Sequence, residues 1–177
     1  SSILSTAQNG TFLKVGNDLP YQVLTAEMSE GNKLNVLCGT VDSLYIYERD
    51  NDTWNFVAKG YNYARSLNLG FERFFLRQIN SKWHVLKAEV DHLKIWHQNG
   101  NDLDSLKSYS ESFVDNVVVF QNGLYMIGYF NAAGTSILKY RNSQFSFSKI
   151  PETNRGVGTG NGAKDRILFS TGGSSSI

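Results

Sequence analysis

The sequence predicts an all-β fold made of β-propeller blades, which are four-stranded antiparallel sheets arranged around a common axis. Three observations lead to this prediction: the apolar runs are short and alternating, Gly, Asn and Asp separate them, and one segment recurs farther along the chain. No window of twelve or more residues carries the 3.6-residue period of an amphipathic helix. Of the 177 residues, 41% are hydrophobic and 13% aromatic, which is enough to bury a sizeable core.

Strands are expected wherever Val, Ile, Leu, Tyr, Phe and Trp alternate with polar residues between turn-forming residues. The expected strands are Lys33–Val41, Ser43–Arg49, Thr53–Lys59, Glu72–Ile79, Lys82–Val90, His92–Gln98, Leu103–Tyr109, Val114–Phe120, Gly123–Phe130, Ser136–Arg141, Gln144–Ile150 and Arg166–Ser170.

A recurring segment gives the period of the fold. Residues 36–47 match residues 85–96 at six of twelve positions, at a constant offset of 49. The stretch 136–140 follows the similar stretch 92–96 by 44 residues. Units of about 40 to 50 residues with four short strands are typical of propeller blades, whose sheets are apolar on both faces and need neighbours on both sides.

Counting strands divides the chain into about three and three-quarter blades. The expected divisions are a partial blade at 1–30, blades at 31–79, 80–120 and 121–170, and a linker or the start of a further blade at 171–177. Propellers have four to eight blades, so we expect this segment to belong to a larger ring. A small four-bladed ring closed by the tail, and a sandwich or barrel of the same strands, are the alternatives.

The third unit resembles known propeller families. Asn122–Phe130, Ser136–Tyr140 and Phe147–Pro151 are similar to the EAR repeat of secreted and cell-surface proteins. The segment Asn154-Arg155-Gly156 departs from that repeat, which has an Asp-Trp-Glu segment there. The propeller segments of large secreted Rhs/YD-repeat, toxin-like proteins look similar too. Either resemblance implies an extracellular interaction module without catalytic residues.

Charge and composition argue against several classes of partner. Seventeen basic and sixteen acidic residues give a net charge of +1 without a basic stripe, which disfavours a nucleic-acid surface. The longest apolar stretch, Val117–Phe120, is too short to span a membrane. Cys38 is the single cysteine, lies in an apolar run and is expected to be a buried hydrophobe.

Several motifs resemble cofactor or metal sites, but ordinary roles in loops, strands and turns explain them better. The Gly-rich stretch 156–164 resembles a phosphate loop, but a strand is expected after it instead of a helix, so we interpret Gly156–Gly162 as a flexible loop between strands. His84, His92 and His97 suggest a metal, but His92 and His97 lie five apart on one strand, so alternation directs them to opposite faces. The Asn/Asp-rich turns at 50–52 and 99–104 lack the spacing of a calcium loop. We therefore predict no cofactor, no metal ligand and no catalytic residue.

Carbohydrate-active propellers provide the main enzymatic alternative. Only Thr53-Trp54 matches the Asp-box of propeller glycosidases. Glycoside cleavage needs a placed pair of carboxylates, and the sequence alone pairs none of its candidates, which are Glu27, Glu30, Glu48, Asp42 and Asp91. Because Asp42 and Asp91 recur at the same place in the repeat, we expect them to cap the turn between two strands.

The sequence therefore favours a non-enzymatic propeller segment of a larger extracellular protein, acting as scaffold and interaction surface. Its expected partners are the remaining blades of the same protein or of an associated chain, and a protein or glycan ligand. A glycan-binding or glycosidase-like propeller is the alternative. Two sequons, at Asn9 and Asn51, fall in expected turns and are the candidate N-glycosylation sites.

Overall fold

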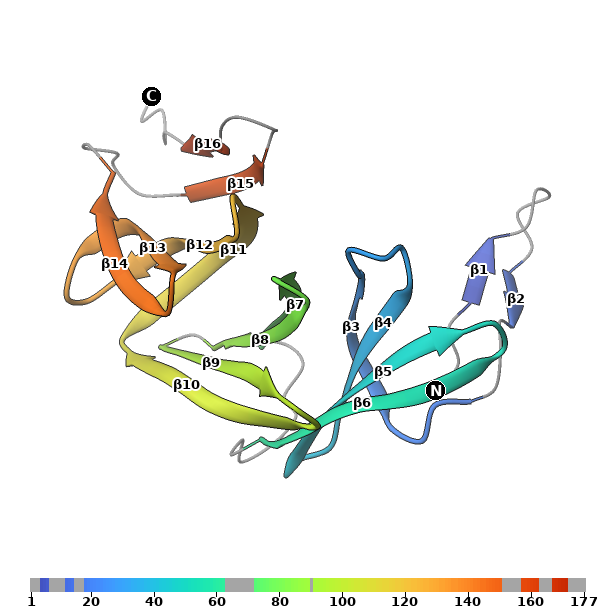
Figure 1. Ribbon diagram of the computed structural model, residues 1–177. Coiled ribbons are helices and arrows are strands. Elements are labelled where there is room, and N and C mark those ends of the chain that lie inside the picture. Colours follow the sequence, from blue (N-terminus) through green and yellow to red (C-terminus); the bar gives the residue numbers. More distant parts are fainter. Residues whose placement is uncertain are drawn as a thin grey trace.

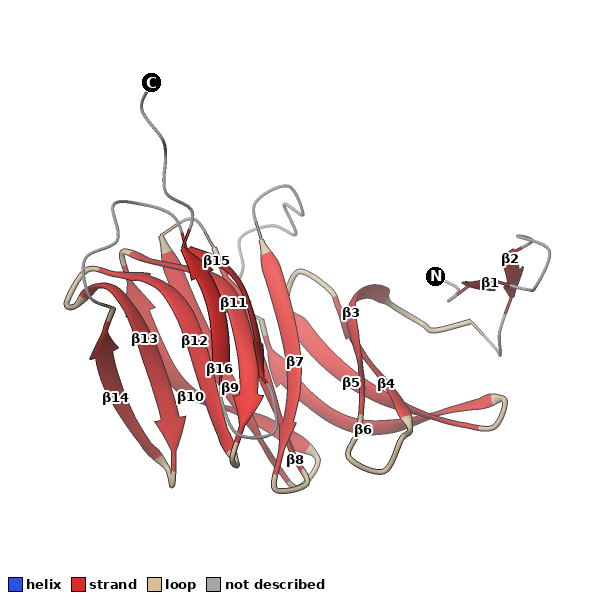
Figure 2. Ribbon diagram, turned by 90° about the horizontal axis from the view of Figure 1, so that it is seen from above, coloured by secondary structure: helices blue, strands red, loops and turns tan. Residues whose placement is uncertain are grey.

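The computed structural model is all-β, which confirms this part of the prediction. It describes residues 4–6, 12–14, 18–62, 72–89, 91–150, 157–162 and 167–171, with side chains in 18–62, 72–89 and 91–150. This part of the chain forms sixteen strands and no helix (Figures 1 and 2).

Three successive groups of four strands form antiparallel meanders, called units here. Unit 1 contains β3 (Gln22–Met28), β4 (Leu34–Gly39), β5 (Ser43–Asp50) and β6 (Thr53–Tyr61). Unit 2 contains β7 (Arg73–Ile79), β8 (Lys82–Ala88), β9 (His92–Asn99) and β10 (Asp102–Ser110). Unit 3 contains β11 (Ser112–Phe120), β12 (Gly123–Phe130), β13 (Gly134–Arg141) and β14 (Gln144–Lys149).

Two hairpins accompany the units. β1 (Leu4–Thr6) pairs with β2 (Phe12–Lys14), and β15 (Val157–Gly162) pairs with β16 (Ile167–Thr171). The expectation of a flexible loop at Gly156–Gly162 is therefore wrong for residues 157–162. Glycines do not favour strands by propensity, but here the backbone pairs with the apolar strand β16.

Units 1 and 2 together form one eight-stranded sheet in the order β3-β4-β5-β6-β10-β9-β8-β7. A single parallel bridge, between Lys59 and Asp102, joins the two halves. The edge strands β3 and β7 contact each other, so the sheet is barrel-like and nearly closed. Gly60 lies at this seam, where an added Cβ would come within 2.6 Å of Leu103 Cβ. A larger residue at this position would push the two units apart.

The first strands of the units are neighbours in space. β3 contacts β7, β7 contacts β11, and β11 contacts β15. Figure 1 shows β7 and β11 toward the middle of the arrangement, while the fourth strands β6, β10 and β14 lie toward its outside. Residues from well-separated parts of the sequence therefore meet along β3, β7 and β11.

The hydrogen-bonded units differ in phase from the predicted divisions. The divisions at residues 31, 80 and 121 fall after β3, β7 and β11, so each of them separates a first strand from the sheet with which it pairs. A sequence repeat gives the length of a unit but not which strand begins its sheet. β3 was also missing from the expected strands, because its residues are half-exposed and alternate only weakly.

The core lies between the units, and the sheet of unit 2 contributes apolar side chains from both of its faces. One cluster joins Leu37, Leu44 and Ile46 of unit 1 to Trp83 and Val85 of unit 2. A second cluster joins the other face of unit 2 to unit 3, and its members include Leu86, Leu93, Ile95, Leu124, Met126 and Leu138. All four residues expected from the repeat to be core are fully buried: Leu44, Ile46, Leu93 and Ile95.

Short turns join the paired strands. Asn80-Ser81, Gln121-Asn122 and Asn142-Ser143 each have positive φ at both residues, which is the conformation of a type I′ hairpin turn. The Asn and Ser side chains suit this conformation better than β-branched ones do. These turns explain why polar pairs between apolar runs predicted the strand ends well.

In units 1 and 2 the turn between the second and third strands is tied to the chain just after the fourth strand, and in unit 3 the start of β13 takes the place of this turn. The backbone N–H of Asn62 donates to Asp42 O at 2.8 Å, and that of Ser112 donates to Asp91 O at 3.1 Å. In unit 3, Ile150 N–H donates to Thr135 O at 3.4 Å. Asp42 and Asp91 therefore lie in equivalent turns, where their backbone oxygens accept these hydrogen bonds.

Truncating a residue buried between two units should destabilise the whole assembly of sheets. We expect Ile95→Ala to lower the free energy of unfolding by about 2–5 kcal/mol, because the lost side chain leaves a cavity that unit 3 cannot fill. Phe56→Ala is the control, since Phe56 is 48% exposed and should cost less than half as much. Urea denaturation measures both. Equal midpoints for Ile95→Ala and the parent protein would contradict this assignment of the core.

Candidate functional site

A polar pocket of about 480 Å³ lies where the first strands of the three units converge. Its lining comes from the end of β3 and the following turn, from β7, and from the middle of β11. The lining residues are Glu27, Met28, Ser29, Glu30, Arg77, Gln78, Asn116, Val117, Val118 and Val119. We call it the central pocket. It is within the size range of small-ligand sites, and all three units contribute to it.

Arg77 connects the three units at this pocket. Its Nη1 donates to Glu27 Oε2 of unit 1 at 2.5 Å, and its Nε donates to the backbone oxygen of Val117 in unit 3 at 3.2 Å. The guanidinium also lies 5.9 Å from the ring centre of Phe75. Arginine suits this position because its planar fork can satisfy acceptors on two sides at once.

Further polar contacts hold the pocket rim. The backbone N–H of Glu30 donates to Gln78 Oε1 at 2.7 Å, so the turn after β3 is fastened to β7. Asn116 Oδ1 accepts a hydrogen bond from the backbone N–H of Val117 at 2.8 Å. The pocket thus presents two carboxylates, one guanidinium and two amides, which can exchange hydrogen bonds with a polar ligand such as a peptide backbone or a sugar.

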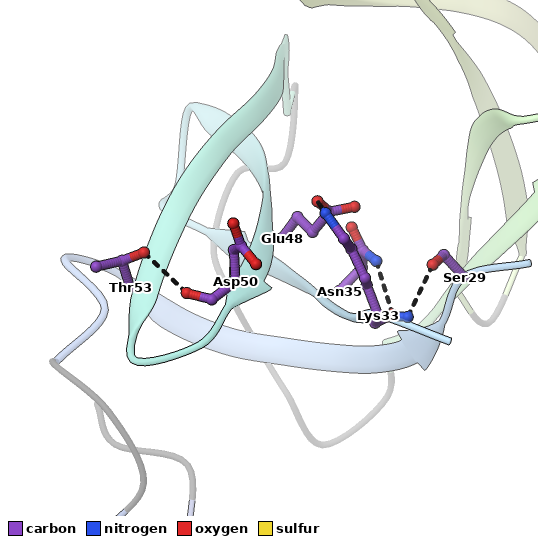
Figure 3. A network of polar contacts seen from close by, with 6 residues as sticks. All are labelled: Ser29, Lys33, Asn35, Glu48, Asp50 and Thr53. Atoms are coloured by element: carbon purple, nitrogen blue, oxygen red, sulfur yellow. Dashed lines mark hydrogen bonds and ion pairs between the residues drawn. The ribbon is translucent and has the colours of Figure 1, made fainter. Parts of the chain in front are cut away.

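A polar row on unit 1 leads from Glu27 across the sheet, and Figure 3 shows its part around Lys33, Asn35 and Glu48. Glu27, Asn35 and Glu48 are direct cross-strand neighbours. Lys33 Nζ lies 2.8 Å from Glu48 Oε1, and the Lys33 backbone N–H donates to Ser29 Oγ at 3.1 Å. Asn35 is fully buried and its Nδ2 donates to Lys33 O at 3.0 Å. This row fixes the turn that forms one wall of the pocket.

The carboxylates named from the sequence are distributed over different parts of the fold. Glu27 and Glu30 come together in the central pocket, whereas Glu48 pairs with Lys33 and the aspartates Asp42 and Asp91 lie in turns. Glu27 is engaged by Arg77. Sequence reasoning missed Arg77, Gln78 and Asn116 as their companions. The apolar neighbours of these residues marked the strands, but no local signal showed that three strands would meet.

A second pocket, of about 360 Å³, brings together two histidines. His84 on β8 and His97 on β9 are directly paired, with ring centres 6.4 Å apart, and Tyr140 of unit 3 lies beside His84. His92 instead contacts Asp91 Oδ1 at the turn, which lowers the pKa of that aspartate by hydrogen bonding. The pairing of His84 with His97 follows from the β8–β9 register, which depends on the length of the turn between the two strands.

Among the described residues, no group of three or more His, Cys, Asp or Glu side chains is arranged to hold a metal ion. Cys38 is fully buried, as predicted, and burial raises its thiol pKa to about 11. Its thiolate is therefore scarce at neutral pH. No helix in the described part of the chain is long and apolar enough to cross a membrane.

The candidate glycosylation site Asn51 lies in the β5–β6 turn with an exposed side chain and a φ of 53°. This turn is accessible to a modifying enzyme. Asn9 lies outside the described residues.

Comparison with known proteins gives no family assignment. The sequence matches no model of a known protein family and has no significant match among curated proteins.

Removing the Arg77 fork should loosen the junction of the three units. We expect Arg77→Met to lower the free energy of unfolding by about 1–3 kcal/mol, because Glu27 and the Val117 carbonyl lose a charge-assisted donor. Arg73→Met, which removes a 56%-exposed arginine with a 3.8 Å contact to Asp115, should cost less than about 1 kcal/mol. Urea denaturation measures both values. Similar losses for the two variants would show that Arg77 is an ordinary surface arginine.

His84 should make stability depend on pH. Burial lowers its pKa from 6.5 to about 4, so the unfolded chain takes up the proton more readily than the fold. The neutral, buried His84 makes its full contribution to stability above pH 6.5, and this contribution is lost as the pH falls to 4. The free energy of unfolding therefore decreases by about 2 kcal/mol between pH 7 and pH 5. His84→Gln should flatten this slope in chemical denaturation, whereas His92→Gln should leave it intact. An unchanged slope in His84→Gln would contradict the assignment.

Proposed function

We propose that this chain is a β-propeller segment that acts, without catalysis, as a scaffold and interaction surface of a larger extracellular protein. The observation that carries the proposal is the adjacency of the first strands β3, β7, β11 and β15, each opening a meander or a hairpin. Radially arranged blades place their first strands side by side around an axis, and ligands commonly bind where those strands converge.

The packing of the units favours blades over a simple barrel. A barrel depends on continuous hydrogen bonding between neighbouring strands, yet within the described residues the strand pairing between units 1 and 2 is limited to the bridge between Lys59 and Asp102. Face-to-face burial of apolar side chains provides most of the contact between units. This is how blades are held in a ring.

The outer face of unit 1, directed away from unit 2, supports further blades as partners. It carries Tyr21, Tyr45, Tyr47, Trp54 and Phe56, packed around the buried Val36 and Cys38. The repeat equates Tyr47 and Val36 with Trp96 and Val85, which unit 2 buries against unit 1. We therefore propose that another blade, of the same protein or of an associated chain, covers this face.

A ligand-binding role for the central pocket follows from its polar lining. Its carboxylate, guanidinium and amide groups suit a protein segment or a glycan. The extracellular setting is supported by the resemblance to secreted repeats and by the exposed sequon at Asn51. In a secretory host, we propose that Asn51 is modified.

A carbohydrate-active propeller is the second candidate, because Glu27 and Glu30 share the central pocket. Arg77 is the single arginine among the residues lining this pocket, and it already pairs with Glu27. A hydrolase would need one carboxyl group able to give a proton and another able to attack or to activate water. The binding role requires neither, so it is the better-supported proposal.

The proposal is tested by comparing residues 1–177 alone with the same chain extended by its natural flanking sequence. We expect the isolated chain to self-associate through the outer face of unit 1, and the extension to give a monodisperse species with slower hydrogen exchange in β5 and β6. Electron microscopy of the extended protein should then show a ring. A monodisperse isolated monomer whose β5 and β6 exchange as slowly as β8 and β9 would overturn the proposal.

A further inference from the structure

A third cavity, of about 330 Å³, opens between β10 of unit 2 and unit 3, away from the central pocket. Three aromatic rings form its apolar wall. Tyr109 lies 6.2 Å from Phe130 and 6.0 Å from Phe147, and Phe130 lies 5.3 Å from Phe147, measured between ring centres. Phe130 is buried and anchors the cluster, whereas Phe147 is 39% exposed. We call this cavity the aromatic pocket.

The rest of the aromatic pocket is polar and carries one positive charge. Ser108, Ser110 and Asn131 provide hydroxyl and amide groups, and no aspartate or glutamate lines the cavity. Lys107 Nζ lies 5.8 Å from the ring centre of Tyr109. In the part of the chain whose side chains are described, Lys107 has no carboxylate partner.

We propose that the aromatic pocket binds a saccharide unit that carries a carboxylate. The C–H face of a pyranose is apolar and packs on aromatic rings, while its hydroxyls need the donors and acceptors that Ser108, Ser110 and Asn131 provide. Lys107 has no acidic neighbour in the lining and supplies the charge that complements a sugar carboxylate. An apolar peptide would leave these polar groups unpaired, which disfavours it.

This site is distinct from the central pocket, and only side chains of units 2 and 3 form it. Its experimental test is therefore independent of the proposed ring. The two kinds of sugar acid that meet its chemistry are sialic acids and uronic acids.

The experiment is saturation-transfer NMR on the full chain with three probes: 3′-sialyllactose, a hyaluronan tetrasaccharide and the neutral sugar lactose. We expect transfer to at least one acidic probe and not to lactose, and the stronger acidic probe identifies the class of sugar acid. Phe147→Ala and Lys107→Gln should each raise the dissociation constant of that probe at least about fivefold.

Matched controls lie on unit 1. Phe56→Ala removes another exposed phenylalanine, and Lys59→Gln removes another lysine above a tyrosine, 5.5 Å from the ring centre of Tyr45. Both should bind like the parent protein. Lys107→Gln changes an exposed side chain and keeps the fold, so it remains informative if Phe147→Ala unfolds. Absence of transfer to every probe, equal transfer to lactose, or unchanged binding in Lys107→Gln would overturn the proposal.

Discussion

The structure depends on the burial of both faces of the unit 2 sheet. Alternate residues of β8 point in opposite directions, so that Trp83 and Val85 pack on unit 1 while Leu86 and Ala88 pack on unit 3. A single four-stranded sheet with two apolar faces has no stable form in water on its own. Each unit therefore requires its neighbours, and the order of the units along the chain becomes their order in space.

This dependence explains why polar interactions concentrate where the first strands meet. The first strands β3, β7 and β11 are edge strands of their sheets, where backbone and side-chain polar groups must find partners. Arg77 satisfies acceptors on units 1 and 3 from its place on unit 2, and Gln78 holds the turn after β3. The groups that stabilise the junction thus also form the lining of the central pocket.

A buried charge also lies in the interface of units 1 and 2, beside Phe74 near the start of β7. Lys87 is only 1% exposed, and its Nζ lies 3.0 Å from Glu72 and 2.5 Å from Glu89. Its place in the repeat corresponds to that of Cys38, an apolar position in unit 1. Two carboxylates flank the one ammonium, which makes this arrangement tolerable in a protein interior, and loss of Lys87 would leave both carboxylates without their counter-charge.

Some aromatic residues pack in the interfaces between units, and others lie at the surface. In the interface of units 2 and 3, Phe130 is buried while Phe147 reaches the surface. On unit 1, Tyr21 stacks on Tyr45 at 4.2 Å between ring centres, on a face that no other described unit covers. The cavity beside Phe130 and Phe147 suits a saccharide, whereas the open sheet face around Tyr21 and Tyr45 suits a further blade.

The sequence by itself determined the fold class and most strand positions, since period-two alternation and polar turns act over only a few residues. It also indicated that Leu44, Ile46, Leu93 and Ile95 are core. Tertiary structure decided the rest. Whether β7 pairs with β8 or with β6 depends on long-range hydrogen bonds, and the strand β15 exists because β16 pairs with it. The central pocket unites Glu27 with Arg77, 50 residues apart, because the burial of two-faced sheets brings their first strands together.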